Sequence, residues 1–295
     1  MPTPAVVVIA NPVAGRGRAV AMARAAAALI EQQGVEVVLQ ETTASGHACE
    51  LARMAAASGV DRVLAAGGDG TLHEVATALA HTRCAMGVLA AGRGNDFAGA
   101  LGLPGDPASA AAAMLSGVQT PIDLGVINGR VFLTVAATGL DSAVARRVAA
   151  GEFRIFGELA YLAGALWMLP TWRAPRLRMR GDFGEREGPY LVAAAGNTAR
   201  YGGGIIMTPG ASPHDGLLDC CLVRDLSRLR ALALLPRTYS GTHGRYAEVE
   251  MVRTRRLEIE ADDHVFMTAD GELMGESRAV IEVAPGALLI QGRVP

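Results

Sequence analysis

Lysine is absent from the sequence, so all 27 residues counted as lysine or arginine are arginines. A Walker-type phosphate loop depends on a lysine that reaches the phosphates, and its absence excludes such a loop. Chemistry that passes through a lysine Schiff base is excluded for the same reason. Any phosphate group that this protein binds must therefore meet backbone amides, arginine side chains or a metal ion.

Cysteine is scarce, with four residues in a chain of 295. Cys220 and Cys221 are adjacent, and Cys49 and Cys84 lie far from them and from each other, so none has the paired spacing of a metal site. The histidines show no metal-ligand spacing, and no Gly-x-Ser-x-Gly motif supplies a hydrolase nucleophile. We expect buried free thiols and assign no histidine a catalytic role.

Strong net charge and long apolar runs are missing too. The net charge is -2 and the arginines are spread along the chain, so we expect no nucleic-acid partner. The most apolar later segment, 155–169, contains Glu158 and is too short to span a bilayer, which favours a core helix and no transmembrane segment. The first ten residues show no secretory pattern, and a cytoplasmic location follows as the default.

The first 121 residues alternate between short apolar runs and helical patterns. The apolar runs have the composition of buried strands and lie at 5–10, 35–39, 63–66 and 86–90. Strands that alternate with helices predict parallel β-α-β units, whose ligands bind at the carboxyl ends of the strands. Glycine-containing loops follow three of these runs, and they could line one crevice.

The stretch Gly67-Gly68-Asp69-Gly70-Thr71 follows one of these strands and leads into a helical pattern. Glycines let backbone N–H groups approach a ligand, and a helix start favours an anion, so the stretch predicts a phosphate cradle. Asp69 would repel a phosphate unless a divalent cation lay between them, which indicates magnesium. A tight turn with Asp69 or Thr71 as helix N-cap is the alternative that this stretch alone leaves open.

After Pro121 the pattern changes to short strands separated by turns. Asn128-Gly129 lies between two apolar runs and is typical of a two-residue hairpin turn. Further candidate strands lie at 177–180, 190–195, 217–223, 256–261, 265–268 and 279–283, and candidate helices at 141–149, 156–169 and 226–235. We therefore expect a β-rich second domain that begins near residue 121.

Three places in this second half could carry chemistry. Residues 212–219 form a loop rich in oxygen ligands, which suits magnesium or calcium but is equally typical of a plain turn. Asp270-Gly271-Glu272 brings two carboxylates together, which can act as general base or metal ligands, or can simply form a hairpin tip. Arginines alternate at Arg173, Arg176, Arg178 and Arg180 and could contact phospholipid, although a solvated strand face is the simpler interpretation.

Taken together, these motifs resemble those of the bacterial diacylglycerol kinase family of soluble lipid kinases, which also includes the sphingosine and ceramide kinases. The resemblance covers nearly the whole chain. Its motifs are Asn11-Pro12 with Gly15, Thr42 with Gly46-His47-Ala48, the Gly67–Thr71 run with Glu74, Asn95-Asp96-Phe97-Ala98, Ile122-Asp123-Leu124-Gly125, Asp215-Gly216-Leu217-Leu218-Asp219 and Asp270-Gly271-Glu272. The glycine run is shared with NAD kinases and phosphofructokinases, while the two later Asp-Gly motifs favour the lipid branch.

The resemblance implies a three-layer α/β nucleotide-binding domain of the NAD kinase and phosphofructokinase type over 1–121. A β-sandwich domain for the lipid substrate would follow over 122–283, and 284–295 could return to complete the first domain. The implied activity is transfer of the γ-phosphate of ATP, with magnesium, to the hydroxyl of a diacylglycerol-like lipid. The enzyme would reach this lipid by transient contact with a membrane surface.

The resemblance also assigns roles to residues. The positions implied for ATP are Asn11, Pro12, Gly15, Thr42, Gly67, Gly68, Asp69, Gly70, Thr71, Leu72, His73, Arg93, Asn95 and Asp96. Asp270 or Glu272 would accept the proton of the lipid hydroxyl, Asp69 would help to place the catalytic magnesium, and Asp123 would be a supporting carboxylate. The positions that match a second, structural magnesium site are Ser212, Asp215 and Leu217.

One residue departs from the family pattern. Arg93 stands where family members usually carry a small hydroxyl residue, and we hypothesise that it binds phosphate directly and compensates for the absent lysines. Two other functions stay open on the sequence: an NAD kinase, and a nucleotide- or lipid-binding regulator without turnover. A homodimer through an edge strand also stays open.

Overall fold

The apolar runs of the first third of the chain become the inner strands of a parallel sheet. The computed structural model describes residues 6–153, 155 and 159–294. In the first unit the strands follow the order β2 (Val37–Glu41), β1 (Val6–Ala10), β3 (Arg62–Gly67), β4 (Ala85–Ala90) and the end of β17 (Arg278–Gln291). The residues of β1 and β4 are all buried, which explains why these strands read as unbroken apolar runs.

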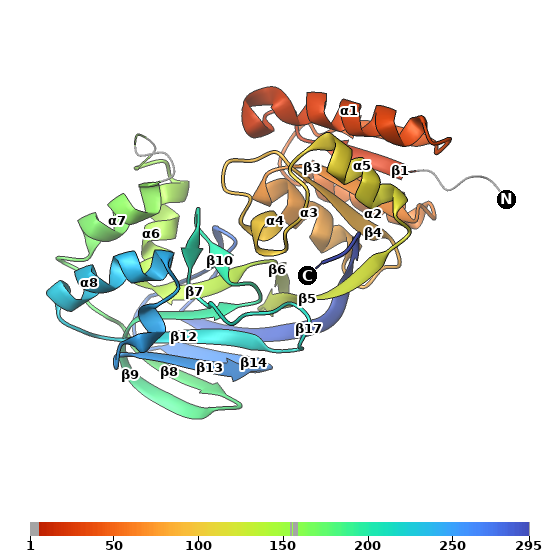
Figure 1. Cartoon of the computed structure of the whole chain (residues 1–295). Coiled ribbons are helices and arrows are strands. Elements are labelled where there is room, and N and C mark those ends of the chain that lie inside the picture. Colours follow the sequence, from red (N-terminus) through yellow and green to blue (C-terminus); the bar gives the residue numbers. More distant parts are fainter. Residues whose placement is uncertain (1–5, 154, 156–158, 295) are drawn as a thin grey trace. The chain divides into compact units, whose positions relative to one another are not determined.

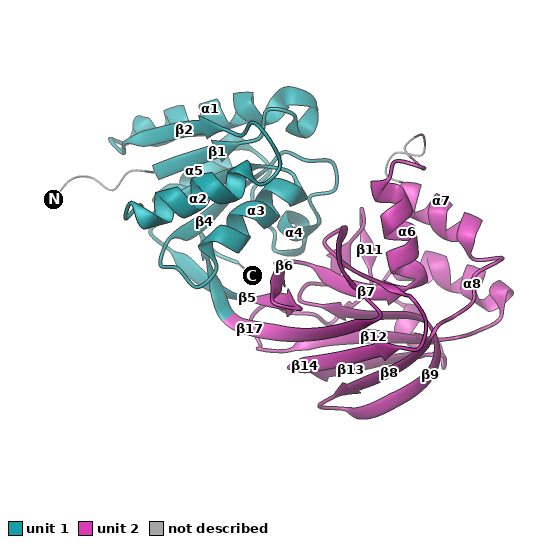
Figure 2. Cartoon of the chain, turned by 180° about the vertical axis from the view of Figure 1, so that it is seen from behind, with its two compact units in different colours: residues 1–123, 286–295 teal, residues 124–285 magenta. Residues whose placement is uncertain are grey.

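Helices cover both faces of this sheet. They are α1 (Arg18–Glu31), α2 (His47–Ala57), α3 (Asp69–Leu79), the short α4 (Asp96–Ala100) and α5 (Pro107–Leu115), with a 3-10 turn at Ala14–Gly17. The pair α1 and α5 packs on one face and the pair α2 and α3 on the other (Figures 1 and 2). The expected three-layer α/β fold is therefore confirmed.

The chain leaves the first unit along β5 (Gln119–Ile127) and returns along β17, so each strand belongs to both units. The first unit comprises residues 1–123 and 286–295, and the second comprises residues 124–285 (Figure 2). The segment after residue 285 pairs with β4, as a returning last strand would. The assignment of the two units to nucleotide and lipid remains a prediction at this stage.

The second unit is built from two antiparallel sheets that share one long strand. In the second sheet the order is β16 (Glu272–Glu276), β15 (Phe266–Ala269), β7 (Val135–Gly139), β9 (Gly184–Gly196), β12 (Leu218–Arg224) and β13 (Val249–Thr254). The beginning of β9 also pairs with β8 (Arg176–Gly181), which continues to β14 (Arg256–Ala261) and β17. The remaining strands are β6 (Arg130–Phe132), paired with β5, and the small pair β10 (Arg200–Tyr201) and β11 (Ile205–Ile206). The β-rich sandwich expected for this half is confirmed.

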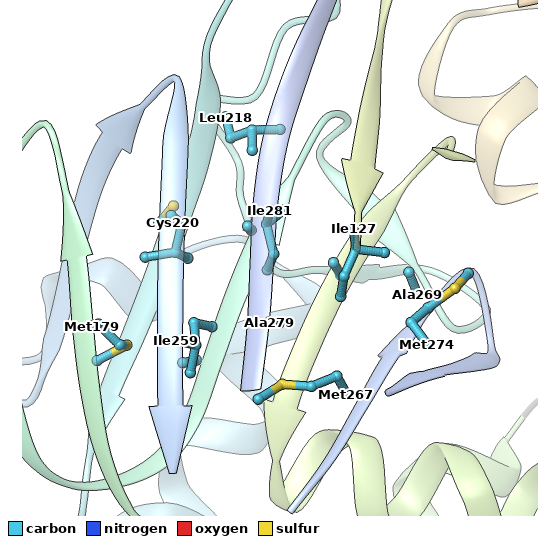
Figure 3. Close-up of a cluster of buried hydrophobic side chains, with 14 of the residues drawn as sticks. Ile127, Met179, Leu218, Cys220, Ile259, Met267, Ala269, Met274, Ala279 and Ile281 are labelled. Carbon is cyan, nitrogen blue, oxygen red and sulfur yellow. The ribbon is translucent and has the colours of Figure 1, made fainter. Parts of the chain in front are cut away.

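Alternate side chains along the strands of the second sheet point to opposite faces, and they contribute to two hydrophobic cores. Leu218 and Cys220 of β12 face the core between the two sheets (Figure 3). Leu222 belongs to the same core. Cys221 and Val223 face the opposite side, beneath the helices. The two adjacent thiols therefore lie on opposite faces of one sheet and cannot bind a common metal ion. Burial raises the pKa of Cys221 to about 12. Cys84, Cys220 and Cys221 are buried free thiols as expected, whereas Cys49 is only half-buried.

Three helices cover the outer face of the second sheet. They are α6 (Leu140–Ala149), α7 (Ala160–Met168) and α8 (Arg228–Tyr239), followed by a 3-10 turn at His243–Arg245. Two expectations for these helices need correction. First, α8 extends four residues beyond its expected end, because Pro236 lies inside the helix without ending it. Second, only Ala160 and Gly164 of α7 are buried, so it is a covering helix and not a core helix, while the beginning of the expected helix at 156–158 lies outside the described residues.

The hairpin turn at Asn128-Gly129 is confirmed, because both residues have positive φ, 50° and 80°, and join paired strands β5 and β6. Strands β13 and β16 were not predicted, and β17 continues eight residues beyond the expected 279–283. The polar, half-exposed residues of β13 and β16 do not produce the apolar pattern on which strand prediction depends. The end of β17 is apolar and largely buried, but Pro285-Gly286 interrupts it with residues typical of a turn.

Gly125 on β5 gives a direct test of packing in the second unit. It is paired with Phe132 on β6, and a Cβ added to Gly125 would overlap the fully buried ring of Phe132. We expect Gly125→Ala to lower the free energy of unfolding by about 1–3 kcal/mol, because the ring must leave its position. Gly99→Ala is the control, since a Cβ there would contact nothing within 4 Å. Equal unfolding temperatures for the two variants would show that the Phe132 ring moves aside for the added methyl group at little cost in stability.

Candidate active site

Three loops converge at the carboxyl ends of β1, β3 and β4 in the first unit. The loop after β4 contacts the loop after β3 so closely that a Cβ added to Gly92 would lie 2.6 Å from Cα of Gly68. The loop after β1 approaches from the other side, where Gly15 has φ of 60° and a Cβ would overlap the carbonyl of Ala91. The glycines are needed here for close approach of backbone to backbone.

A pocket of about 340 Å³ opens beside these loops. It is lined by Asn11, Pro12, Val13, Thr42, Thr43, Ala44, Ser45, Ala48, Gly70, Thr71 and Glu74. Nδ2 of Asn11 donates to Oγ1 of Thr71 at 3.0 Å, while Oδ1 of Asn11 accepts from the backbone of Val13 at 3.1 Å. One amide thus joins the first loop to the start of α3. Asn11, Pro12, Thr42, Gly70 and Thr71 were among the residues named from the sequence, and they lie together.

Glu74 organises the far wall of this pocket and was not among the site residues named from the sequence. Its carboxylate accepts from the backbone of Gly46 at 2.8 Å and of Ala48 at 3.0 Å. Glu74 therefore caps the start of α2 from within α3, and the negative charge also suits the positive end of α2. An acidic residue in the first turns of a helix is common, so this longer contact could not be predicted from the sequence.

Two carboxylates flank the loop after β4. A Cβ added to Gly94 would lie 3.1 Å from Oδ2 of Asp69 and 3.5 Å from Oδ2 of Asp96. Oδ1 of Asp69 also accepts from the backbone of Phe97 at 3.3 Å, which ties the start of α3 to the start of α4. Asn95 has φ of 52°, and its side chain accepts from the backbone of Gly92 at 2.8 Å. The loop is therefore rigid around its glycines.

The remaining residues named for this site have different surroundings. Arg93 is exposed at the tip of the loop after β4. Leu72 is fully buried, so its side chain belongs to the core and only its backbone faces the loops. His73 is half-buried on α3. Asp123 is buried on β5, where it accepts from the backbone of Gly286 at 2.8 Å and so ties β5 to the returning segment.

In the second unit, Asp270 and Gly271 form the turn between β15 and β16, both with positive φ. The Asp270 carboxylate accepts from the backbone of Leu133 at 2.6 Å, and from the backbone and hydroxyl of Thr134 at 2.9 Å and 2.5 Å. Glu272 is half-exposed and pairs with Arg130 at 3.0 Å. Asp270 is therefore fixed in one orientation, while Glu272 is held only by a surface ion pair.

The loop before β12 contains the residues predicted for a second metal site. Oδ1 of Asp215 accepts from the backbone of Leu217 at 3.1 Å, and its other oxygen pairs with Arg253. Arg253 also pairs with Asp219 at 3.2 Å. Ser212 lies in the same loop and is half-buried. Among the described residues no group of three or more histidine, cysteine or acidic side chains could hold a metal ion, so this site remains a prediction that depends on main-chain oxygens.

Alternating arginines on β8 are explained by ion pairs. Arg178 and Arg180 lie directly opposite Glu187 and Glu185 of β9 and pair with them at 3.5 Å and 3.7 Å. Arg176 also pairs with Glu187, at 2.8 Å. The run is a solvated, ion-paired strand face, which leaves its arginines little charge for phospholipid.

An apolar cavity of about 80 Å³ lies between the second sheet and α6, α7 and α8. Its walls include Leu140, Val144, Tyr161, Ala165, Leu191, Val223, Ala231 and Leu234. Asp141 also lines it. Burial raises the pKa of the Asp141 carboxyl to about 6, and a hydrogen bond donated by the hydroxyl of Tyr201 opposes this rise. This pair could not be predicted from the sequence, because the two residues are 60 positions apart.

Comparison with protein families assigns both halves of the chain. Residues 5–127 match the diacylglycerol kinase catalytic domain, and residues 134–292 match the YegS C-terminal NAD kinase beta sandwich-like domain. No helix in the described part of the chain combines the length and apolar character needed to cross a membrane.

Individual relatives agree with this assignment. The chain is 36% identical over 293 residues to a diacylglycerol kinase of Mycobacterium tuberculosis strain H37Rv, covering 97% of this chain and 94% of the relative. It is 34% identical over 269 residues to a Pseudomonas aeruginosa protein named "Probable lipid kinase YegS-like", covering 90% and 88%.

A crystal structure of a diacylglycerol kinase from Bacillus anthracis strain Sterne has the same fold, with a TM-score of 0.74 over 99% of this chain and 98% of that one at 20% identity. On the family models and these relatives, this chain belongs to the diacylglycerol kinase and YegS-like family of lipid kinases.

Proposed function

We propose that this protein transfers the γ-phosphate of ATP, with magnesium, to the hydroxyl group of a diacylglycerol-like membrane lipid. The observation that carries the proposal is the convergence of three glycine loops, without any lysine, at the start of α3 and beside a pocket of about 340 Å³. Backbone amides at a helix start favour phosphate groups. The names of the relatives support a lipid as acceptor.

In this proposal the first unit holds the nucleotide. Asn11, Thr42, Thr71 and the other lining residues would contact ATP in the pocket, and Glu74 would keep the pocket wall in place by capping α2. Arg93 would meet the phosphates from the tip of its loop. Positioning and charge neutralisation dominate phosphoryl transfer, and the rigid backbone contacts of these loops are suited to both tasks.

The residues around Gly94 fit a magnesium ion. Asp69 and Asp96 supply carboxylate oxygens on either side of one glycine, and magnesium is commonly held by one or two carboxylates together with substrate phosphates and water. When bound, the ion would supply positive charge against the negative charge of the phosphates. In the second unit, Ser212, Asp215 and Leu217 are proposed for a structural ion, with Arg253 as the present partner of Asp215.

The acceptor side of the proposal rests on the second unit. Asp270 is our candidate for the base that accepts the proton of the lipid hydroxyl, because a general base must be held in a fixed orientation and three donors fix this carboxylate. The apolar cavity under α6, α7 and α8 would take part of an acyl chain. At about 80 Å³ it must widen to do so, since pockets for larger ligands occupy roughly 300 Å³ or more.

The test of this function is transfer of labelled phosphate from ATP and magnesium to diacylglycerol, phosphatidylglycerol, sphingosine or ceramide in mixed micelles. NAD is offered in a parallel reaction. Label in a lipid supports the proposal and names the acceptor. Label in NAD alone contradicts it in favour of a nucleotide acceptor, and binding of ATP without any labelled product would indicate a regulator without turnover.

The choice between Asp270 and Glu272 can be tested with two variants. We expect Asp270→Asn to lower kcat roughly 10²- to 10⁴-fold, and Glu272→Gln to change it less than about tenfold. Thr134→Val is the matched control, because it removes one hydrogen bond from the Asp270 carboxylate and keeps the carboxylate itself. Thermal unfolding of all three shows how much of each effect is structural. A larger loss in Glu272→Gln would assign the base to Glu272.

A separate prediction concerns the contact between Arg93 and the nucleotide. We expect Arg93→Ala to raise KM for ATP about three- to tenfold, because a charge-assisted contact to phosphate is lost at an exposed site. Arg83→Ala is the control: Arg83 is also exposed, but it precedes β4 while Arg93 follows it, so it lies at the opposite edge of the sheet. Unchanged KM for ATP in Arg93→Ala would remove this residue from the phosphate site.

Asp141 predicts a pH dependence of stability in the second unit. Because its folded pKa is raised from 3.8 to about 6, the folded state retains a proton that the unfolded state has lost. This contribution is present at low pH and disappears as pH rises through the folded value. Asp141→Asn keeps an acceptor for Tyr201 and removes the titration. Its free energy of unfolding relative to wild type should therefore rise by roughly 2.5 kcal/mol between about pH 4 and pH 7. Urea unfolding measures the difference, and a constant difference would contradict the raised pKa.

A further inference from the structure

Asn197 is a fully buried polar residue to which the proposed function gives no role. It directly follows Gly196, the last residue of β9, and Gly196 pairs with Val135 at the beginning of β7. The end of β9 therefore lies beside the segment that leads into β7. A buried amide side chain is costly unless hydrogen bonds satisfy it, so its partners show what it holds in place.

The two carbonyl groups of the segment Leu133–Thr134 accept hydrogen bonds from this end of β9. Nδ2 of Asn197 donates to the carbonyl oxygen of Leu133 at 3.1 Å. The backbone N–H groups of Asn197 and Thr198 both donate to the carbonyl oxygen of Thr134, at 2.8 Å and 3.2 Å. A carbonyl oxygen can only accept, so the side-chain atom that faces Leu133 is the nitrogen, and this fixes the orientation of the Asn197 amide.

The N–H groups of the same segment bind Asp270. The backbone N–H groups of Leu133 and Thr134 donate to the two carboxylate oxygens of Asp270, at 2.6 Å and 2.9 Å. Asp270 and Asn197 are therefore bonded to the N–H groups and the carbonyl groups, respectively, of one short piece of chain. Any shift of this piece moves the donors that fix the carboxylate.

One peptide group connects the two side chains directly. Its C=O belongs to Leu133 and accepts from Nδ2 of Asn197, while its N–H belongs to Thr134 and donates to Oδ1 of Asp270. The C=O and N–H of a peptide are conjugated, so a hydrogen bond at one end polarises the group and strengthens the bond at the other end. The Asn197 amide thus both fixes this peptide and makes its N–H a better donor to the carboxylate.

The order of strands in the second sheet brings these distant residues together. β15, β7 and β9 are antiparallel neighbours, so the end of β15, the beginning of β7 and the end of β9 lie at one edge of the sheet. Asp270 follows β15, Thr134 precedes β7 and Asn197 follows β9. The contact therefore depends on the register of three strands, and not on any local motif.

Thr198 shows that burial at this place does not by itself create the connection. It is 1% exposed and adjacent to Asn197, but its hydroxyl makes no hydrogen bond to any residue that the structure describes. Two neighbouring polar side chains are thus equally buried, and the side chain of Asn197 is the one that binds the segment holding Asp270.

We propose that Asn197 is a positioning residue for Asp270 and acts through the peptide group between Leu133 and Thr134. Its amide holds that peptide with the N–H directed at the carboxylate. The carboxylate then keeps the orientation in which it can accept a proton from a substrate hydroxyl. The inference rests on the proposed function, because Asp270 is the candidate base of that function, and it assigns Asn197 no contact with substrate.

The first measurement is the kinetics of Asn197→Ala with ATP, magnesium and the lipid that wild type phosphorylates in mixed micelles. We expect kcat to fall about five- to twentyfold, because the carboxylate keeps its charge and loses part of what fixes it, and KM for ATP and for lipid to stay within about twofold. Thr198→Val is the matched control and should keep the wild-type kcat. Equal losses of kcat in the two variants, or a raised KM with unchanged kcat in Asn197→Ala, would overturn the proposal.

A double-mutant cycle with Asp270→Asn tests whether Asn197 acts through Asp270. In the Asp270→Asn background, Asn197→Ala should lower kcat by less than about a further twofold, because the group that it positions is already lost. If the loss in the double variant is the product of the two single losses, Asn197 acts independently of Asp270 and the proposal is wrong.

Urea unfolding of wild type, the two single variants and the double variant tests the connection without catalysis. The double variant should lose less stability than the sum of the single losses, because both substitutions disturb one hydrogen-bonded chain. Asn197→Ser, which leaves a smaller gap, replaces Asn197→Ala if that variant does not fold. Non-additive stability in a protein that phosphorylates no lipid supports the connection and contradicts the proposed function. Additive stability in a protein that phosphorylates a lipid supports the function and overturns the role of Asn197.

Discussion

Direct contact between backbones is the constraint on which the first unit's site depends. The loops after β1, β3 and β4 approach so closely that side chains at Gly15 and Gly92 would occupy the space of neighbouring backbone. With the loops this close, Asn11 reaches Thr71 and Asp69 reaches the backbone of Phe97. The hydrogen bonds of the site are thus consequences of the contact. A larger residue at one glycine would separate the loops and all their side chains together.

Several acidic residues at and near the candidate site bind backbone amides. Glu74 caps α2, Asp123 ties β5 to the returning chain, and Asp270 holds the connection between β6 and β7. Such carboxylates gain a fixed position from these bonds, and their loss would leave amides unsatisfied. Hydrogen bonds that fix a carboxylate for a structural role also give it the fixed position that catalysis requires. Substitution of such a residue would therefore change both activity and stability. Activity and stability have to be measured side by side in this family for that reason.

Sequence reasoning reached the fold of both units because the responsible patterns are local. Unbroken apolar runs in β1 and β4 identify strands covered on both faces, and Asn128-Gly129 identifies its hairpin by backbone conformation alone. The sequence also predicted that candidate site residues come together where loops follow strands, and Asn11, Gly70 and Thr71 do line one pocket. Contacts between residues far apart in the sequence could not be predicted. The hydrogen bond between Tyr201 and Asp141 is an example. Helix α7 was misjudged as core because composition reports how apolar a helix is and not what covers it.

The arginines of this chain, which has no lysine, differ in whether they are paired with a carboxylate. On β8 they face glutamates across the strand pair, and their charge is neutralised within the second unit. Around α7 and α8, and at the tip of the loop after β4, Arg173, Arg237 and Arg93 have no acidic partner in the part of the chain that the structure describes. A guanidinium left without a carboxylate keeps its charge and its planar set of donors for an external anion. In the proposed function, Arg93 would meet the phosphates of the nucleotide from the tip of its loop. In a protein without lysine, geometry has to make this division, because apart from histidine every cationic side chain is an arginine.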